Sequence, residues 1–238
     1  MNKSTLELER IKGAYARRKE AYPEDYYSLL RPGNLFIAQE RERLTLELFR
    51  RHDLTNLREK RILDVGCGMG GMLRTLVNYG AQPGNLYGID LLPERIQEAQ
   101  NLSPNTNFLC GNAEQLPWPN ETFDLIMQFT VFTSILQADM KAAIAREMMR
   151  VLKPQGFILW YDYLISKPTN RDVKGVGKGE IRSLFAGCRF SFHRTTLAPP
   201  LARRLAPLSL GLCSILSKIP PLCTHYLVLI QKESHHAP

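Results

Sequence analysis

The stretch 61–76, RILDVGCGMGGMLRTL, decides how the rest of the chain folds. A short apolar run, 62–65, leads into four glycines within six residues, and an amphipathic helix is expected at about 70–79. Glycine reaches positive φ and lets a ligand approach the bare backbone. The helix that follows directs its N-terminal N–H groups and positive dipole end at whatever lies above the loop. We therefore expect this strand, loop and helix to cradle a nucleotide or a cofactor.

Two known sequence motifs fit the residues of this glycine-rich stretch. From Gly66 the chain reads G-x-G-x-x-G, and Asp90 follows about twenty residues later, as in the dinucleotide-binding fingerprint. From Asp64 it reads D-x-G-x-G-x-G, with a carboxylate ahead of the first glycine. The glycines alone leave a nicotinamide-dependent oxidoreductase open. The wider context favours the second motif.

That context is a set of four segments in order. LDVGCGMG resembles motif I of the class I S-adenosylmethionine-dependent methyltransferases. Segments 86–100, 108–126 and 146–163 resemble the later motifs of the same family, and the resemblance extends over about 40–163. It implies S-adenosyl-L-methionine as cofactor and an α/β, Rossmann-like, seven-stranded sheet. It also implies an N-terminal helical cap and the seventh strand antiparallel between the fifth and sixth.

Apolar strand patterns alternate with amphipathic helices along the core, which predicts a parallel sheet covered by helices on both faces. We predict strands at 61–65, 86–90, 106–110, 123–128, 156–163, 189–196 and 225–232, and helices at 40–51, 70–79, 93–100 and 138–152. Ligands bind such sheets at the carboxyl ends of the strands.

The predicted domain organisation has three parts. Residues 1–60 form a helical cap, in which Pro32-Gly33 is expected to break the chain ahead of the helix at 40–51. Residues 61–238 form the methyltransferase domain. Its insertion at about 197–224 is apolar, basic and rich in proline, and is interpreted as a lid over the substrate. The segment 167–180, rich in lysine and glycine, is expected to be a mobile loop over the same opening.

Charge is unevenly distributed along the chain. The net charge is +8, and residues 163–238, with eleven basic and three acidic side chains, contribute all of it. This bias indicates either a solvated face or attraction to an anionic substrate or a membrane surface. Nucleic acid is not expected, because no basic patch interleaved with aromatic residues is present.

The expected cellular compartment of the protein follows from its cysteines and from the length of its apolar runs. The five cysteines lack paired spacing and a C-x-x-C motif, so we expect reduced thiols and no metal site. The charged N-terminus does not resemble a secretory signal, and the longest apolar run is too short to span a bilayer. We predict a cytoplasmic protein without transmembrane segments, for which peripheral membrane contact remains open.

The resemblance assigns roles to cofactor-binding residues. Asp90 would accept both ribose hydroxyls. Asn112, where the family more often has Asp, would read the adenine amino group. Asp64 would order the glycine loop through backbone N–H groups, and either Arg41 or Arg43 would reach the methionine carboxylate. The full set is Asp64, Gly66, Cys67, Gly68, Gly70, Asp90, Leu91, Asn112, Ala113 and Gln128.

The sequence identifies the substrate-binding and catalytic residues less closely than the cofactor-binding residues. The substrate candidates lie on the tyrosine-rich cap, after the fourth and fifth strands and in the insertion; they are Tyr26, Phe129, Thr130, Phe132, Tyr161, Arg203 and Arg204. Methyl transfer requires positioning of the acceptor and, where necessary, removal of a proton. The candidates for that base are His193, His225 and Asp162.

The predicted function is methylation of a small molecule, at a hydroxyl of a glycosyl or secondary-metabolite acceptor. The near alternative is methylation at carbon or nitrogen of a quinone, lipid or amine. Two alternatives come from other classes: an NAD(P)-dependent oxidoreductase, and a non-catalytic cofactor-binding scaffold that docks on a membrane or partner. Fold and cofactor do not decide among acceptors.

Overall fold

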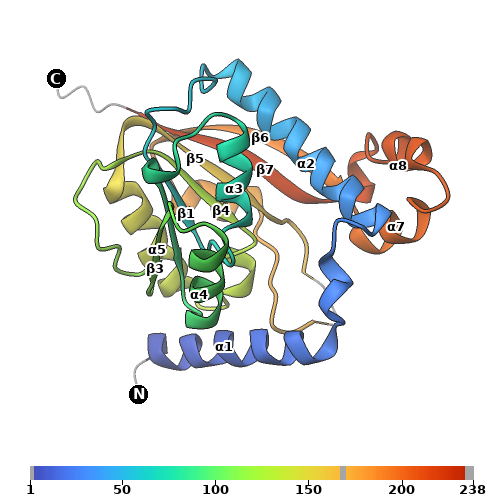
Figure 1. Cartoon of the computed structure of the whole chain (residues 1–238), viewed down its shortest axis with the longest axis horizontal. Coiled ribbons are helices and arrows are strands. Elements are labelled where there is room, and N and C mark those ends of the chain that lie inside the picture. The colour runs from blue at the N-terminus through green and yellow to red at the C-terminus, as the bar shows by residue number, and fades with distance from the viewer. Residues whose placement is uncertain (1–2, 167–169, 234–238) are drawn as a thin grey trace.

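A computed structural model describes residues 3–166 and 170–233 and shows one seven-stranded sheet in the order β3-β2-β1-β4-β5-β7-β6 (Figure 1). The strands are β1 Ile62–Val65, β2 Leu86–Asp90, β3 Asn107–Cys110, β4 Phe123–Phe129, β5 Leu152–Tyr163, β6 Cys188–Leu197 and β7 Cys223–Lys232. The helices are α1 Lys3–Ala21, α2 Pro32–Arg51, α3 Gly71–Asn78, α4 Pro93–Leu102, α5 Ala138–Val151, α6 Lys178–Leu184, α7 Pro199–Leu205 and α8 Leu210–Leu216. Short 3-10 turns are η1 Glu24–Tyr27, η2 Pro83–Asn85, η3 Phe132–Ser134 and η4 Pro220–Leu222.

The sheet is mixed. Strand β1 pairs in parallel with β2 on one side and with β4 on the other, so the chain reverses its direction of winding at β1. Strand β7 runs antiparallel between β5 and β6. This topology confirms the predicted fold class, and the carboxyl ends of β1 and its neighbours are where ligands bind in sheets of this kind.

Alternate residues of the central strands bury against two different helix layers. In β1, Leu63 belongs to the core cluster that α5 covers through Ile144. Its neighbour Ile62 belongs to the second cluster, which α2 covers through Leu48 and α3 through Leu73. Successive side chains in a strand point to opposite faces. A strand that is buried on both faces is therefore almost continuously apolar. All four residues of β1, including Asp64, are accordingly buried.

Two helices differ from the prediction. Helix α2 begins at Pro32, eight residues before the predicted start, because proline suits the first turn of a helix, where its missing N–H costs nothing. Helix α6 begins at Lys178, within the segment predicted to be a loop. Burial of Ile181 and of the adjoining Phe185 stabilises it despite weak local helix propensity. Residues 167–169 of the predicted loop lie outside the described residues.

The chain between β6 and β7 leaves the sheet as α7, α8 and η4, which lie together at one end of the molecule beside the start of α2 (Figure 1). At the other end of the cap, α1 runs past the sheet and is linked to α2 by η1. No helix in the described part of the chain is long and apolar enough to cross a bilayer.

Candidate functional site

The loop after β1 requires glycine for two physical reasons. Gly66, Gly68 and Gly70 have φ of +73°, +54° and +74°, which side chains with a Cβ rarely adopt. A Cβ on Gly66 would also lie 2.4 Å from a Val131 methyl group, and one on Gly70 2.7 Å from the ring of Phe108. The cradle is therefore shaped by close approach of its neighbours as well as by backbone conformation.

Asp90 holds this loop in place. Its Oδ2 accepts a hydrogen bond from the Gly68 N–H at 2.8 Å, and its Oδ1 accepts from the Leu92 N–H at 3.0 Å. The sequence predicts instead that Asp64 orders this loop. That assignment was wrong, because the backbone N–H that the loop offers points toward the end of β2.

Among the residues that the structure describes, three buried polar atoms beside the loop have no hydrogen-bond partner. They are Arg41 Nε, Asp64 Oδ1 and Gln128 Nε2. The Gln128 Oε1 accepts from the Val131 N–H at 3.1 Å, which leaves its amino group as the unpaired end. An unpaired buried polar group costs about 1–3 kcal/mol, so three at one edge of a sheet indicate a polar ligand. Two donors and one carboxylate are the complement of a zwitterion.

Charge at this edge is balanced by Arg41. Burial and the negative charge of Asp90 raise the pKa of Asp64 well above its usual value, and Arg41 opposes that shift. The Arg41 guanidinium lies over the rings of Phe129 and Tyr161, at 5.3 and 5.4 Å from their centroids. Of the two predicted arginines, Arg41 is thus the one with a buried, unpaired donor, whereas Arg43 is exposed.

The predicted adenine-binding turn follows β3. The Asn112 Oδ1 accepts from the Glu114 N–H at 3.0 Å, and its Nδ2 donates to the Glu114 carboxylate at 2.9 Å. Leu91 and Ala113 pack against the core cluster as partly buried side chains. Ser4 of α1 also donates to Glu114, so the N-terminal helix is tied to this turn.

Helix α1 docks across the loops that follow β3 and β4. Glu7 is 4% exposed, and its carboxylate accepts from the Leu136 N–H at 2.5 Å and from Arg10 at 2.9 Å. Arg10 in turn donates to the Ser134 carbonyl at 2.6 Å. The sequence does not reveal this Glu7–Arg10 pair, because a charged pair on a weakly amphipathic helix gives no local signal of burial.

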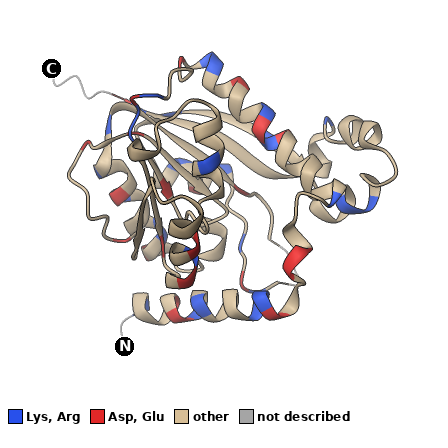
Figure 2. Cartoon of the chain, viewed as in Figure 1, with Lys and Arg blue, Asp and Glu red and all other residues tan. Residues whose placement is uncertain are grey.

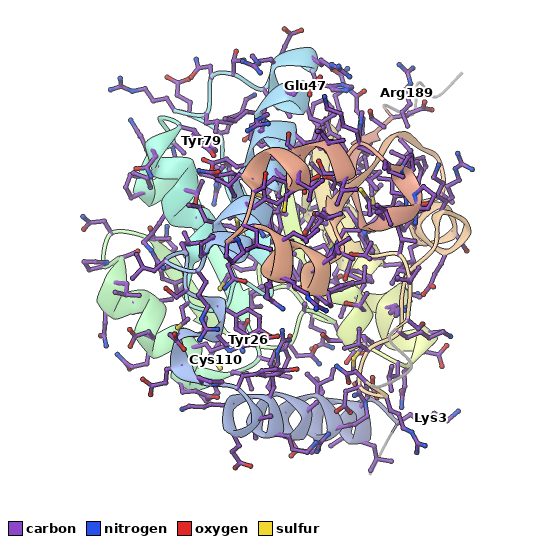
Figure 3. All side chains as sticks on the ribbon, turned by 90° about the vertical axis from the view of Figure 1, so that its right-hand side faces the viewer. Lys3, Tyr26, Glu47, Tyr79, Cys110 and Arg189 are labelled. Carbon is purple, nitrogen blue, oxygen red and sulfur yellow. The ribbon has the colours of Figure 1, made fainter. Side chains whose placement is uncertain are left out.

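A cavity of about 240 Å³ lies between α1, η1 and the chain that follows β5. Its wall is aromatic and basic, with Tyr15, Tyr22, Tyr26, Tyr27, Tyr163, Arg17, Arg18 and Arg203 among the lining residues and Asp172 as the acidic one. Figure 3 shows Tyr26 between α1 and the body of the molecule. The cavity is therefore suited to an aromatic, hydroxylated or anionic ligand.

Arg203 joins the insertion to the cap at this cavity. Its Nη1 donates to the Tyr26 hydroxyl at 2.9 Å, its Nε donates to Asn34 Oδ1 at 2.9 Å, and its guanidinium lies over the Tyr26 ring. Arg204, the neighbouring candidate, is exposed and lies outside the cavity wall. The structure thus separates two residues that the sequence grouped together.

The remaining substrate candidates fall into two groups. Thr130 directly follows β4 and has a φ of +57°, which is a strained conformation for a β-branched residue. Its N–H donates a hydrogen bond to the Tyr161 carbonyl at 2.7 Å. Phe129 and Tyr161 pack ring to ring at 5.8 Å between centroids. Phe132 is instead fully buried against Trp160, so its predicted place in the reaction chamber was wrong.

The three candidate bases lie in different environments. His225 is 3% exposed and stacks on Tyr161 at 4.7 Å, while Tyr163, which lines the cavity, lies 3.8 Å from its ring centroid. His193 hydrogen-bonds Ser191 and lies near the end of α2, where burial and the charge of Arg51 lower its pKa. His193 does not line the cavity.

Asp162 acts as a clamp between β5 and the loop after β4. It is 1% exposed and accepts hydrogen bonds from the Thr133 hydroxyl at 2.5 Å, the Thr133 N–H at 3.2 Å and the Tyr163 N–H at 3.0 Å. Burial raises its pKa to about 7. Because its oxygens are committed to these donors, Asp162 positions the end of β5 and does not face the cavity.

Comparison with known proteins shows what this arrangement is similar to. Residues 62–156 match the family model of a methyltransferase domain. A 106-residue segment is 35% identical to the 2-methyl-6-phytyl-1,4-hydroquinone methyltransferase of a Synechocystis strain and covers 43% of this chain and 31% of that protein. A 128-residue segment is 34% identical to the phthiotriol/phenolphthiotriol dimycocerosates methyltransferase of Mycobacterium leprae and covers 53% and 43%. The chain thus aligns with less than half the length of each relative.

A solved structure shares the architecture. An S-adenosylmethionine-dependent methyltransferase from Mesorhizobium loti superposes with a TM-score of 0.58 over 78% of this chain and 96% of that one, at 17% identity. At that identity the likeness concerns the fold alone. Together with the domain model matched over residues 62–156 and the glycine loop of β1, it makes this chain similar, in domain sequence and in fold, to the class I, S-adenosylmethionine-dependent methyltransferases.

Proposed function

We propose that the chain transfers a methyl group from S-adenosyl-L-methionine to a small-molecule acceptor. The observation that carries this proposal is the set of unpaired buried atoms on Arg41, Asp64 and Gln128 beside the glycine loop. A zwitterionic amino-acid end would satisfy all three, and a nicotinamide dinucleotide has no such group. The glycine cradle is compatible with either cofactor, so these atoms decide between them.

Each cofactor contact uses a group that the structure leaves available. Arg41 and Gln128 would donate to the methionine carboxylate, and Asp64 would accept from the ammonium. Asp90 would accept from the ribose hydroxyls with the lone pairs that its two backbone donors leave open. Asn112, with Leu91 and Ala113, would hold the adenine. The cofactor supplies an electrophilic methyl group on a sulfonium.

The acceptor is proposed to be a hydroxylated small molecule that carries negative charge or an aromatic ring. The cavity wall supports this proposal through its tyrosines and its arginines 17, 18 and 203. The proposed acceptor of the hydroxyl proton is His225, which contacts the ring of Tyr163 in the cavity wall. Relatives named for methylation of a hydroquinone, of a sterol at carbon and of norajmaline at nitrogen keep carbon and nitrogen acceptors as the alternative.

The helical segment 1–60 is proposed to cap the site. Helix α1 contacts the turn after β3 through Ser4 and the loop after β4 through Glu7 and Arg10. Arg95 of α4, which would lie 3.9 Å from a Cβ on Gly68, also packs on the Tyr15 ring at 4.4 Å. These contacts support a cap that excludes water from both cofactor and acceptor.

Calorimetric titration with S-adenosylhomocysteine and, in parallel, with NAD and NADP tests the proposal. We expect binding of the thioether alone. Arg41→Ala should weaken it roughly 10- to 150-fold, equivalent to about 1.5–3 kcal/mol for a lost charge-assisted hydrogen bond. Arg43→Ala, which alters an exposed arginine on the same helix, is the matched control and should bind as the wild type does. Binding of a dinucleotide instead, or equal effects of the two variants, would overturn the assignment.

A further inference from the structure

The insertion between β6 and β7 carries an apolar surface that the proposed activity does not use. Residues 198–222 fold into α7, α8 and η4 and are anchored by a small core of Leu197, Ala202, Ala206 and Cys213 with Phe36 and Ile37 of α2. Figure 1 shows this unit at one end of the molecule, where β6 ends and β7 begins. We call residues 198–222 the α7–α8 hairpin.

The outward side of the hairpin is rich in exposed leucine and isoleucine. The exposed fractions are 81% for Leu208, 51% for Leu210, 42% for Leu212, 64% for Ile215 and 42% for Ile219. These are five of the sixteen large apolar side chains that are exposed in the described part of the chain, and they fall within twelve residues. Leaving such a surface in water is unfavourable, and clusters of this kind mark interaction sites.

A second apolar turn lies beside the hairpin. Leu30 is 95% exposed and Leu29 57% exposed, just before α2. Gly33, three residues later, packs so closely on α7 that a Cβ there would lie 2.4 Å from the Arg203 backbone. The start of α2 therefore extends the apolar end of the molecule.

Positive charge accompanies the apolar residues of the hairpin, and the hairpin itself has no acidic residue. From Ile181 to Lys232 the sequence has seven Lys or Arg residues and no Asp or Glu. Arg204 and Lys218 flank the exposed leucines, are themselves exposed, and form no ion pair among the described residues. Figure 2 shows blue on α7 and no red on the hairpin.

The charge and the exposure of the hairpin together indicate which kind of partner binds its surface. Exposed leucine and isoleucine flanked by unpaired cations complement an anionic lipid surface, where acyl chains receive the apolar side chains and phosphates attract the cations. A symmetric dimer through the same surface would bring Arg204 and Lys218 close to their own copies without an acidic residue to neutralise them. Helix α8, with seven residues, is too short to span a bilayer and suits a shallow interfacial position.

We propose that the α7–α8 hairpin docks this protein on anionic lipid bilayers. Helix α7 also supplies Arg203 to the cavity wall, so docking would bring the cavity beside the lipid surface and favour amphiphilic acceptors. That consequence depends on the proposed methyltransferase function. Docking itself does not depend on it.

Vesicle flotation of the full chain tests the proposal. We expect the protein to float with vesicles of phosphatidylcholine and phosphatidylglycerol at a molar ratio of about 7:3, and to remain behind with phosphatidylcholine alone. High salt should release it, because the attraction is screened. The double variant Leu208→Ser/Ile215→Ser should lower the partition coefficient roughly tenfold or more, and so should Arg204→Glu/Lys218→Glu.

Leu102→Ser is the matched control, because Leu102 is 52% exposed at the end of α4, outside the hairpin. It should float as the wild type does. Equal thermal unfolding of all variants would show that the fold is intact, and unchanged binding of S-adenosylhomocysteine would separate this result from any failure of the proposed function. Flotation that the hairpin variants leave unchanged, or no flotation with anionic vesicles, would overturn the proposal. So would a dimer that sediments as such and dissociates in the Leu208→Ser/Ile215→Ser variant.

Discussion

At the scale of single residues, the glycine loop shows two different reasons for excluding a side chain. Gly66 and Gly187 have nearly the same positive φ, +73° and +77°. A Cβ on Gly66 would collide with Val131, whereas a Cβ on Gly187 would meet nothing within 4 Å. The pair therefore separates backbone strain from steric overlap.

We expect Gly187→Ala to lower the free energy of unfolding by about 1–2 kcal/mol, the cost of a left-handed conformation with a Cβ. Gly66→Ala should lower it by a further 1–3 kcal/mol or so, because the added methyl group overpacks the site. Urea denaturation of the two variants measures the difference. Equal destabilisation would show that the Val131 side chain moves aside without cost.

Asp162 predicts a pH dependence of stability. Burial raises its pKa from 3.8 to about 7, so the folded state retains a proton that the unfolded chain loses between those values. Its contribution to stability is complete below about pH 4 and is lost as the pH rises through about 7. Asp162→Asn removes this titration, although its amide places a donor against the Thr133 or Tyr163 N–H at every pH.

The free energy of unfolding of the wild type, relative to that of Asp162→Asn, should therefore fall as the pH is raised across this window. Chemical denaturation at a series of pH values measures it. A relative stability that stays flat, or that rises with pH, would contradict the assignment of a raised pKa to this carboxyl group.

At the scale of elements, α1 is held by a few polar contacts rather than by a large apolar face. Only Glu7 and Ile11 of its nineteen residues are buried. Glu7 accepts the Leu136 N–H and orients Arg10 toward the Ser134 carbonyl. A helix attached in this way can open without unfolding the sheet.

Glu7→Gln should therefore accelerate hydrogen exchange of the α1 amides while changing the global free energy of unfolding by less than about 1 kcal/mol. Glu9→Gln is the matched control, since Glu9 is an exposed residue of the same helix paired with Lys12. Exchange measured by mass spectrometry on peptides from the N-terminal segment distinguishes them. Equal protection in the two variants would mean that other contacts hold α1.

At the scale of the whole molecule, three parts meet around the carboxyl ends of the strands. They are the residues proposed to bind the cofactor, the helical cap 1–60 and the insertion between β6 and β7. A ligand that pairs the buried atoms of Arg41, Asp64 and Gln128 binds the folded state only. At a concentration of about 100 times its Kd, such a ligand adds about 2.7 kcal/mol of stability. For a chain of this size that raises Tm by roughly 5–10 °C.

We expect S-adenosylhomocysteine to raise Tm in this way and Arg41→Ala to abolish most of the rise at the same concentration. Scanning calorimetry with and without the ligand measures it. A comparable rise with NAD would contradict the proposed cofactor.

The sequence by itself determined the fold and the position of the glycine loop. Strand and helix alternation, the glycines from Gly66 and the acidic end of β2 are local patterns, because each depends on residues close together in the chain. The predicted position of the seventh strand, antiparallel between the fifth and the sixth, was confirmed, and the predicted strand ranges lie within a few residues of the observed ones. Such patterns can be recognised without any knowledge of the tertiary contacts.

Only the tertiary structure decided which side chains meet. It gave the ordering of the loop to Asp90, gave Arg41 and not Arg43 a buried unpaired donor, buried Phe132 in the core and placed Arg203 but not Arg204 in the cavity wall. Each of these outcomes depends on segments far apart in the chain. The physical reason is that burial and hydrogen-bond partnership are properties of packing between elements, and a single sequence carries periodicity but not register between distant surfaces.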